Sequence, residues 1–296
     1  MVGNTYQREI NSMNLSEINL RDPFILLDDG KYYLYGTRGY EAWGECTGLD
    51  VYVSDDLVEW SEPIECFKRF EGFWATKNFW APEVHKYKGA YYMLASFKGE
   101  SRSRGTQILR ADSPIGPFLP HSDGPITPCE WECLDGTLYV EEGIPYMIFC
   151  HEWTQVVDGE MYAVRLADDL SAPVGEPRLL FKASELPCGS NKRHKGYITD
   201  GPFLYRMGNG RLIMIWSSFN DKGYIEAVAF SDSGSINGNW IQCDMPMSDE
   251  NGGHGMLFRD KAGSLCFTMH SPNGPSGAER VKLLKVCETD VAPYLS

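Results

Sequence analysis

One structural unit repeats five times along this chain of 296 residues. Each copy contains a polar residue beside Gly or Pro, a short apolar run, a turn and a second apolar run. Turns such as Asp28-Asp29-Gly30 and Gly208-Asn209-Gly210 between apolar runs are typical of β-hairpins. Positions 22, 81, 135, 200 and 254 take the same place in the five copies. Such self-similarity at a regular period indicates a repeat architecture.

A second feature recurs in phase with the first. An Asp-containing turn follows 31 to 33 residues after the start of four units, in Ser54–Leu57, Ala111–Pro114, Ala167–Leu170 and Ser231–Ser233, and a weaker copy lies at Cys287–Asp290. Each unit therefore predicts a four-stranded antiparallel sheet. Five such sheets in radial array form an all-β, five-bladed β-propeller. We expect one domain over residues 1–296, with residues 1–20 as an N-terminal arm that closes over the first and last blades.

Titratable residues begin four of the five innermost strands. Asp22, Asp135, Asp200 and His254 should approach the propeller axis on one face. Three carboxyl groups close together at the propeller axis lower the stability of the fold, because like charges repel and burial disfavours the ionised form of each group. Fold stability offers no reason for this arrangement, which is typical of a catalytic centre. The alternative is that each Asp only forms a turn, since Asp-Gly and Asp-Pro are common turn dipeptides.

The second strand of each hairpin returns to the same face and adds Arg38 and Glu152 to the expected site. The alternative for Glu152 is a solvated loop acid. Four aromatic residues in the same loops could bind the C–H faces of sugar rings or could simply pack between blades: Trp43, Phe79, Trp80 and Trp153. The polar stretch 184–196 precedes Asp200 and is either a cover for the pocket or a surface loop.

Charge and composition limit the classes of binding partner, the cell compartment and the state of the cysteines that we expect. The chain carries 27 Lys and Arg against 41 Asp and Glu, a net charge of −14, so we expect neither nucleic acid nor an anionic membrane as partner. Residues 1–20 lack a charged segment followed by an apolar core, which predicts a cytoplasmic protein, with a secreted form whose signal has been removed left open. The odd number of cysteines, 9, without a CxxC pair, predicts reduced thiols rather than a zinc site. No oligomeric state is predicted.

Read in order, these blocks resemble glycoside hydrolase family 43 over roughly residues 19–290. The matching motifs are RDPFIL at Asp22, WAPE at Trp80, LDGTLY at Asp135, TDGPFLY at Asp200 and GHGMLF at His254. The phrases SDDLVEW, ADSPIGPF and LADDLSAPVGEP are also similar to that family. The resemblance implies a five-bladed propeller that cleaves arabinofuranosyl or β-xylosyl linkages with inversion of configuration, so the expected partner is a pentose-containing oligosaccharide or polysaccharide.

The resemblance also implies residue roles. Asp22 matches the general base, and Asp135 matches the carboxylate that orients the acid and modulates its pKa. The family's general acid is usually Glu in a Glu-Gly-Pro context, whereas this chain has Asp200, one methylene shorter. Either the sugar sits closer, or another acid such as Glu152 serves. His254 matches a family histidine near the channel, often beside a bound calcium ion or an ordered water. No cofactor is required by this chemistry, and a calcium ion in the channel would be structural.

Two alternatives remain beside the inverting hydrolase. A retaining five-bladed propeller, such as the fructan-cleaving families, has the same blade number, but its Trp-Met-Asn-Asp-Pro-Asn-like nucleophile context is absent around Asp22. A carbohydrate-binding or catalytically impaired propeller would keep the funnel without efficient turnover. The aspartate at position 200 is the main support for that reading.

Overall fold

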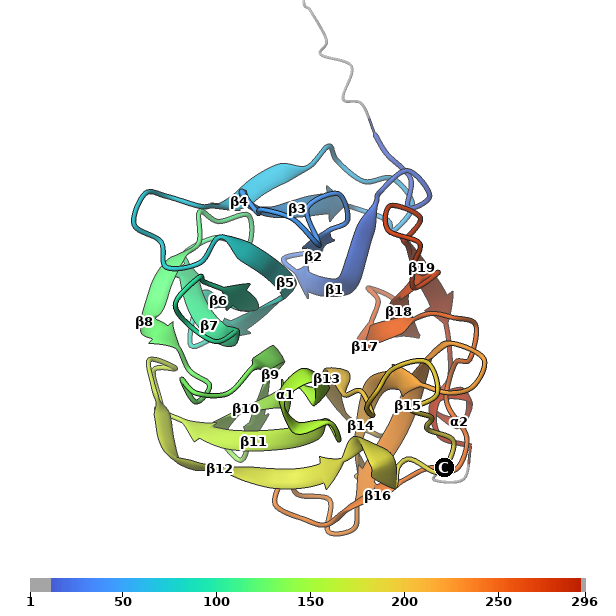
Figure 1. Cartoon of the computed structure of the whole chain (residues 1–296). Coiled ribbons are helices and arrows are strands. Elements are labelled where there is room, and N and C mark those ends of the chain that lie inside the picture. Colours follow the sequence, from blue (N-terminus) through green and yellow to red (C-terminus); the bar gives the residue numbers. More distant parts are fainter. Residues whose placement is uncertain (1–11, 294–296) are drawn as a thin grey trace, which may run out of the picture.

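Five antiparallel sheets surround a central axis in the computed structural model, which describes residues 12–293 (Figure 1). Each sheet is one blade, and its strands follow chain order from the axis outward. The first two blades are β1 (Leu20–Asp28), β2 (Lys31–Arg38), β3 (Gly48–Ser54) and β4 (Ile64–Lys68), then β5 (Lys77–Tyr87), β6 (Ala90–Lys98), β7 (Gly105–Ala111) and β8 (Leu119–Pro125). The third and fourth are β9 (Cys133–Glu141), β10 (Ile144–His151), β11 (Glu160–Leu166) and β12 (Pro173–Lys182), then β13 (Asp200–Arg206), β14 (Leu212–Phe219), β15 (Tyr224–Ser231) and β16 (Trp240–Gln242). The predicted five-bladed propeller is confirmed.

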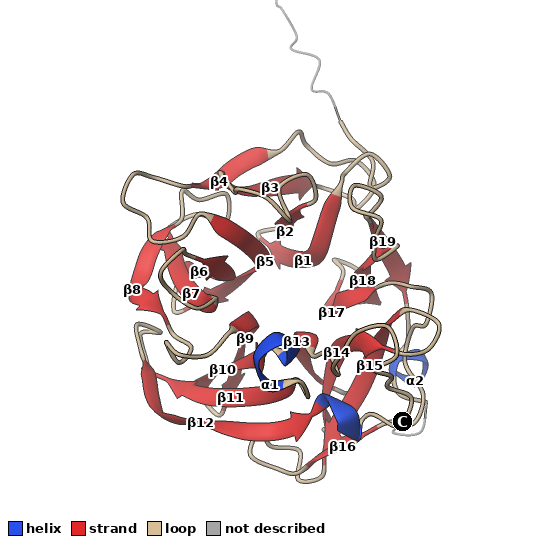
Figure 2. Ribbon diagram, in the orientation of Figure 1, coloured by secondary structure: helices blue, strands red, loops and turns tan. Residues whose placement is uncertain are grey.

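The fifth blade differs from the prediction of four strands. Its sheet has three strands within the described residues: β17 (Gly253–Arg259), β18 (Leu265–Ser271) and β19 (Arg280–Lys285). The chain then turns into α2 (Glu288–Val291), which lies against the fourth blade, where Glu288 accepts from the Tyr205 hydroxyl and the Gly208 N–H, each at 3.0 Å. The remaining short helices are α1 (Trp153–Val156) and a 3-10 turn at Ala183–Glu185, so strands dominate the ribbon (Figure 2). No described helix has the length and apolar character that crossing a membrane requires.

The hairpin turns follow directly from the sequence. In the first three blades the two central turn residues both have positive φ, as in Asp29 (+46°) and Gly30 (+70°). Two consecutive positive φ angles are the type I′ geometry, whose twist matches that of the strands it joins. The second strands are buried on both faces, because each blade is covered by two neighbours; β6 is buried over eight consecutive residues, Ala90–Phe97. Such strands carry continuous apolar runs instead of alternation.

The described part of the predicted arm joins the first and last blades. The Met13 backbone pairs with Trp60 of the first blade through two hydrogen bonds of 2.7 and 2.8 Å. The Arg280 Nε of the fifth blade donates to the Ser16 carbonyl at 2.8 Å. Residues 1–11 of the predicted arm lie outside the described residues.

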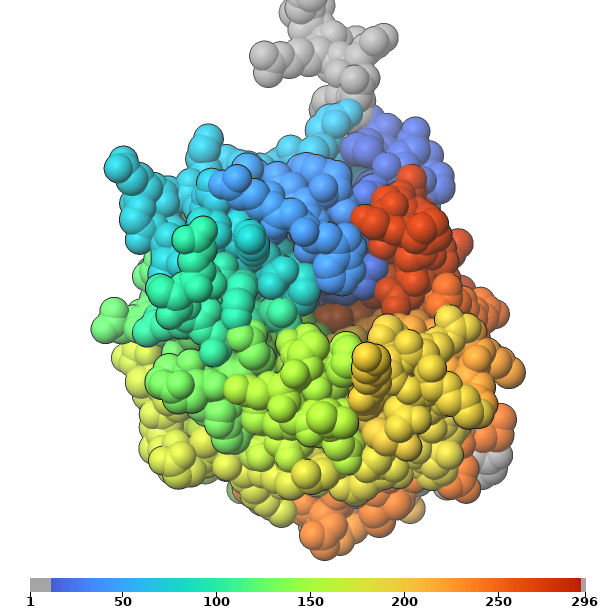
Figure 3. Space-filling view, in the orientation of Figure 1, coloured from blue at the N-terminus to red at the C-terminus, as the bar shows by residue number. Residues whose placement is uncertain are grey.

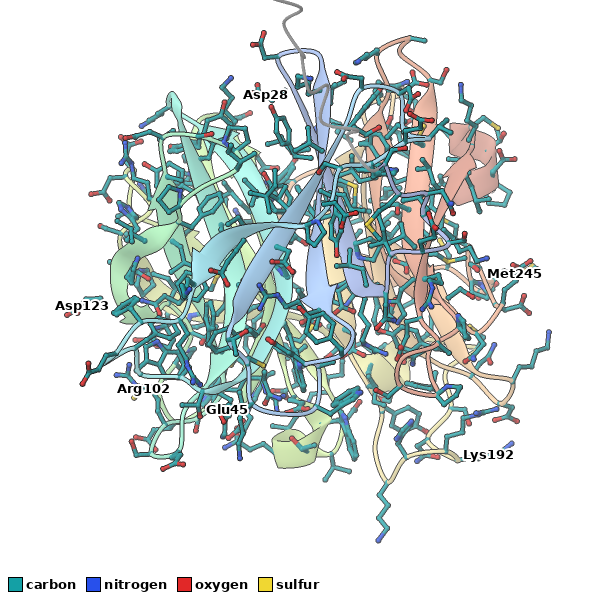
Figure 4. The ribbon with its side chains drawn as sticks, turned by 90° about the horizontal axis from the view of Figure 1, so that it is seen from above. Asp28, Glu45, Arg102, Asp123, Lys192 and Met245 are labelled. Atoms are coloured by element: carbon teal, nitrogen blue, oxygen red, sulfur yellow. The ribbon has the colours of Figure 1, made fainter. Side chains whose placement is uncertain are left out.

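The two faces of the propeller differ. Seen at right angles to Figure 1, the loop that carries Lys192 lies at one end of the molecule and Asp28, where β1 ends, lies at the opposite end (Figure 4). All innermost strands run in the same direction, so their first residues meet at the end that carries Lys192. This face is the one seen in Figure 3, and it is hollowed at its centre, where the blades meet.

Candidate active site

A β-bulge opens every innermost strand. In each blade, two residues of the first strand oppose one residue of the second, and the first of the two has a positive φ. These residues are Asp22 (+54°), Ala81 (+46°), Asp135 (+57°), Gly201 (+49°) and His254 (+52°). Non-glycine residues rarely adopt this conformation, and such strained positions cluster at functional sites. A bulge re-aims its side chain, which brings Asp22, Asp135 and His254 together.

Asp200 departs from the predicted equivalence by one residue. It pairs with Ser217, as Arg21 pairs with Thr37, so it precedes the bulge, and Gly201 takes the position of Asp22. Positions 22, 81, 135 and 254 are equivalent, as predicted, and the fifth equivalent is 201 instead of 200. The Asp200 side chain therefore enters the pocket beside the Asp22, Asp135 and His254 group rather than within it.

Hydrogen bonds between neighbouring blades hold the bulges. At four of the five junctions, the N–H of a bulge residue donates to a side chain on the second strand of the preceding blade. The pairs are Ala81 N to Thr37 Oγ1 (2.8 Å), Asp135 N to Ser96 Oγ (2.8 Å), His254 N to Ser217 Oγ (2.6 Å) and Asp22 N to His270 Nδ1 (3.2 Å). At the remaining junction the second strand offers Cys150, and Gly201 N donates to Asp135 Oδ2 (3.0 Å). Satisfied buried donors make this ring rigid.

Asp22 is surrounded by groups that favour its ionised form. The Thr37 hydroxyl donates to Asp22 Oδ2 at 2.5 Å, and His254 Nδ1 lies 3.2 Å from Asp22 Oδ1. Burial works to raise the pKa of Asp22, but His254, Arg21 and the Thr37 hydrogen bond outweigh it, and the pKa is lowered. For His254, burial works in the opposite direction to the charges of Asp22, Asp135 and Asp200, which prevail and raise its pKa. A carboxylate and an imidazolium therefore face each other.

His270 is a neutral acceptor despite its place near Asp22. Its Nδ1 accepts the Asp22 backbone N–H, so that nitrogen carries no proton, and Nε2 lies 3.3 Å from Asn273 Oδ1. Burial, with the charge of Arg21, lowers the pKa of His270 to about 3. The 3.4 Å approach of His270 Nδ1 to Asp22 Oδ1 is therefore a contact and not an ion pair.

Asp135 and Asp200 are held in the opposite state. Burial raises the pKa of both carboxyls, and the surrounding negative charges add to this: Asp200 and Asp22 for Asp135, Glu152 and Asp22 for Asp200. Asp135 Oδ2 accepts the Gly201 N–H and lies 3.7 Å from His254 Nδ1, while Asp200 Oδ2 accepts the Tyr224 hydroxyl at 2.9 Å. The site therefore combines an ionised carboxylate with carboxyls that tend to keep a proton, which is the division of roles that acid–base catalysis needs.

These groups line a cavity of about 520 Å³. One wall carries Trp80 and Trp43, whose rings lie 5.3 Å apart, edge to face. Trp153, His194 and Phe219 also line the cavity, and the His194 ring contacts the other two with centroids 5.7 and 4.5 Å apart. His194 belongs to the stretch 184–196, so this stretch contributes to the pocket, which was one of the two alternatives predicted for it. A cavity lined by acidic and aromatic side chains fits a sugar ring, whose C–H faces pack on aromatic rings and whose hydroxyls bond to carboxylates.

Of the predicted site residues, the cavity is lined by Asp22, Asp135, Asp200, Glu152, His254, Trp43, Trp80 and Trp153. Glu152 is buried and accepts from Arg104 Nη1 at 2.7 Å and from Thr154 Oγ1 at 2.8 Å, so it is not a solvated loop acid.

Phe79 and Arg38 were predicted wrongly. Phe79 follows the alternation of β5, so it points away from its neighbour Trp80 and packs against Phe97 with ring centroids 4.9 Å apart. Arg38 follows Thr37 in β2 and likewise turns away, where its Nη2 pairs with Asp50 Oδ1 at 2.6 Å. Neither lines the cavity.

His254, predicted as a neighbour of calcium through a water, faces two carboxyl groups through its Nδ1. Calcium takes six to eight oxygen ligands, and His254 directs Nδ1 toward Asp22 and Asp135. Over residues 12–293, no group of three or more His, Cys, Asp or Glu side chains is arranged to hold a metal ion. The calcium ion that the resemblance implies near His254, reached through a water, stays a prediction.

Two buried residues near the site were not predicted. Tyr224 lines the cavity, and Glu226 accepts from Ser217 Oγ (2.9 Å) and from the Gly255 N–H (3.1 Å) beside His254. Burial raises the pKa of Glu226 to about 7. Both stand in β15, where the sequence YIEAVAF reads as an ordinary strand. A glutamate inside an apolar strand was the one available signal.

Comparison with known proteins shows the family and the fold. The profile of the family described as glycosyl hydrolases family 43 matches residues 15–288. An endo-arabinase of Bacteroides thetaiotaomicron, of known structure, is 40% identical, with a TM-score of 0.86 over 95% of this chain and 98% of that one. A thermostable family-43 glycoside hydrolase shares the fold at 22% identity, with a TM-score of 0.81 over 97% and 95% of the two chains. A β-xylosidase of Xylanibacter ruminicola is 29% identical over 143 residues, which span 42% of this chain and 44% of that protein.

Proposed function

Because the chain belongs to the glycosyl hydrolases of family 43, we propose that it hydrolyses α-L-arabinofuranosyl linkages in an arabinose-containing glycan, with inversion of configuration. The choice of sugar is supported by the 40% identity to an endo-arabinase over nearly the whole chain. The β-xylosidase match covers less than half of either protein and supports a xylosyl substrate less strongly. The observation that carries the proposal is the opposite perturbation of Asp22 and Asp200 in one cavity.

Asp22 is the general base of the proposed reaction. Its pKa is lowered. The Thr37 hydroxyl donates to Oδ2 and His254 Nδ1 faces Oδ1, so the ionised carboxylate is fixed in orientation. It takes a proton from a water molecule, which attacks the anomeric carbon from the face opposite the leaving group. An inverting site needs the two carboxyls roughly 6.5–9.5 Å apart to admit this water.

Asp200 is the general acid. Its raised pKa keeps a proton available near neutrality, and this proton passes to the glycosidic oxygen as the bond from that oxygen to the anomeric carbon breaks. Asp135 supports the acid from the neighbouring blade: it accepts the N–H of Gly201, the residue next to Asp200. The ionised form of Asp200 in turn raises the pKa of Asp135, so the two buried carboxyls do not both ionise readily.

The test uses arabinan, linear arabino-oligosaccharides and aryl α-L-arabinofuranosides, with aryl β-xylosides for comparison. Proton NMR of the first product should show the anomer opposite to that of the substrate. Asp22→Asn and Asp200→Asn should lower kcat by roughly 10²–10⁴-fold while both variants stay folded. A retained anomer would contradict the inverting mechanism, and preferred cleavage of xylosides would contradict the proposed sugar.

A carbohydrate-binding propeller is the second candidate, favoured by one observation: Asp200 stands where the family resemblance implies a longer Glu. Titration calorimetry separates the two candidates. Binding of arabino-oligosaccharide without product formation over a long incubation would favour the binding propeller and contradict the hydrolase.

A further inference from the structure

The buried phenol of Tyr224 contacts the proposed acid directly, and no step described so far uses it. We propose that Tyr224 is the positioning residue of the acid: it decides which oxygen of Asp200 carries the proton and stabilises the carboxylate that remains when the proton leaves. This inference rests on the proposed function, in which Asp200 is the general acid.

Tyr224 reaches Asp200 across one intervening strand. Asp200 begins β13 and Tyr224 begins β15, and both strands pair with β14 between them (Figure 1). The Tyr224 hydroxyl donates to Asp200 Oδ2 at 2.9 Å, and the tyrosine is 2% exposed. Because Oδ2 is occupied by this donor, the proton of neutral Asp200 belongs on Oδ1, the other oxygen.

The tyrosine ring is held before any substrate arrives. It stacks on His270 with centroids 5.8 Å apart and an angle of 27°, and it meets Phe219 at 4.9 Å. The backbone of the fifth blade closes over it at Gly253, where an added Cβ would lie 2.9 Å from Tyr224 Cε1 and 3.0 Å from Cδ1. A donor fixed in this way stabilises developing charge without reorganising during the reaction.

The hydrogen bond from Tyr224 to Asp200 becomes stronger as the reaction proceeds and Asp200 loses its proton. When Asp200 Oδ1 gives its proton to the glycosidic oxygen, the bond between that oxygen and the anomeric carbon breaks, its electron pair stays on oxygen, and Asp200 becomes a carboxylate. The Tyr224 hydrogen bond then changes from neutral to charge-assisted, which is about twice as strong. Burial and the charges of Asp200, Asp22 and Asp135 raise the pKa of Tyr224 well above its usual value, so the phenol keeps the proton it donates. A contact that strengthens toward the transition state raises kcat.

Leaving-group dependence tests this role. Tyr224→Phe is assayed on phenyl and on 2,4-dinitrophenyl α-L-arabinofuranoside. The phenyl glycoside needs the acid, so kcat should fall about 10–100-fold; dinitrophenolate leaves without a proton, so that rate should stay near wild type. The alkaline limb of the pH–rate profile should move up, because the lost hydrogen bond favours the Asp200 carboxylate.

Tyr35→Phe is the matched control. Tyr35 is also a buried tyrosine within a strand, here β2, but its hydroxyl donates to the Pro114 carbonyl, away from the cavity. It should leave both rates and the alkaline limb unchanged. An equal loss on both substrates by Tyr224→Phe, or a loss on neither, would overturn the inference. Wild-type protein inactive on arabinan, on arabino-oligosaccharides and on every aryl arabinofuranoside would overturn the proposed function instead. If Tyr224→Phe does not fold, 3-fluorotyrosine is placed at position 224, since it is a stronger donor of nearly the same shape. The alkaline limb of the pH–rate profile should then move down, because the stronger hydrogen bond favours the Asp200 carboxylate. An unchanged alkaline limb would refute the role.

Discussion

Gly201 should be the glycine at which one added methyl group harms the site most directly. It holds the bulge of the fourth blade at φ +49°, and a Cβ there would lie 2.6 Å from His254 Cδ2 and 2.7 Å from Cγ. Real Cβ contacts essentially never come so close, so the His254 ring must move. That ring cannot move freely, because Nδ1 lies within 3.2 Å of Asp22 Oδ1.

The expected size follows from two contributions. An alanine at positive φ costs about 1–2 kcal/mol, and overpacking a filled core costs about 1–3 kcal/mol. Gly201→Ala should therefore lower the free energy of unfolding by about 2–5 kcal/mol. Gly30→Ala is the matched control: its φ is +70° and nothing lies within 4 Å of its Cβ position, so only the backbone contribution applies.

Urea unfolding and kcat/KM at several pH values measure both effects. Gly30→Ala should keep wild-type activity. Gly201→Ala should lose activity, and the acidic limb of its pH–rate profile should move up, because Asp22 loses part of the His254 charge that lowers its pKa. Equal losses of stability in the two variants, together with an unchanged acidic limb, would refute the packing argument.

The other predictions concern protonation and the bulge contacts. The wild-type pH dependence of kcat/KM should be bell-shaped, with its acidic limb below the ordinary carboxyl range because the pKa of Asp22 is lowered, and its alkaline limb above that range because the pKa of Asp200 is raised; a single limb would contradict two opposed carboxyls. Thr37→Val removes the donor to Asp22 Oδ2 and the acceptor of the Ala81 N–H, so the acidic limb should move up and stability in urea should fall by about 1–3 kcal/mol; no change in either would show that the hydroxyl is dispensable. Folding raises the pKa of Glu226 from about 4.5 to about 7, so the stability it contributes is complete below pH 4.5 and is lost as the pH rises toward 7. Glu226→Gln mimics the protonated acid and should flatten that part of the urea-stability curve by up to about 3 kcal/mol, whereas a curve parallel to wild type would contradict a buried acid at this position.

The fold could be predicted because the same sequence pattern recurs in every blade. Turn dipeptides, double apolar runs and the Asp-containing turns recur in phase, and any single blade would have been ambiguous. Within residues 12–293 the fifth blade has three strands, which could not be predicted. The weaker copy of the turn at Cys287–Asp290 indicated a blade like the others, yet that segment leads into α2.

Site residues could be predicted where the position in the repeat determines the direction of the side chain. They could not be predicted where the register of strand pairing determines that direction. Asp-Gly at 135 and at 200 look alike in the sequence. Only the pairing of Asp200 with Ser217 shows that the bulge lies one residue later than in the other blades. Phe79 illustrates the reverse case, because strand alternation alone would have turned it away from the face of Trp80.

Tyr224 could not be found from the sequence, since a tyrosine at the start of an apolar strand reads as core. Its distance of 24 residues from Asp200 gives no sign of contact. The hydrogen bond exists because two strands of one blade pair with the same central strand.

The opposed protonation of Asp22 and Asp200 is tested most directly by carbon-13 NMR titration of the aspartate carboxyls. Asp22→Asn and Asp200→Asn variants assign the two signals by their disappearance. Asp22 should titrate below the ordinary aspartate value of about 4, and Asp200 should titrate above it. Ordinary values for both groups, or the reverse order, would contradict the division into base and acid.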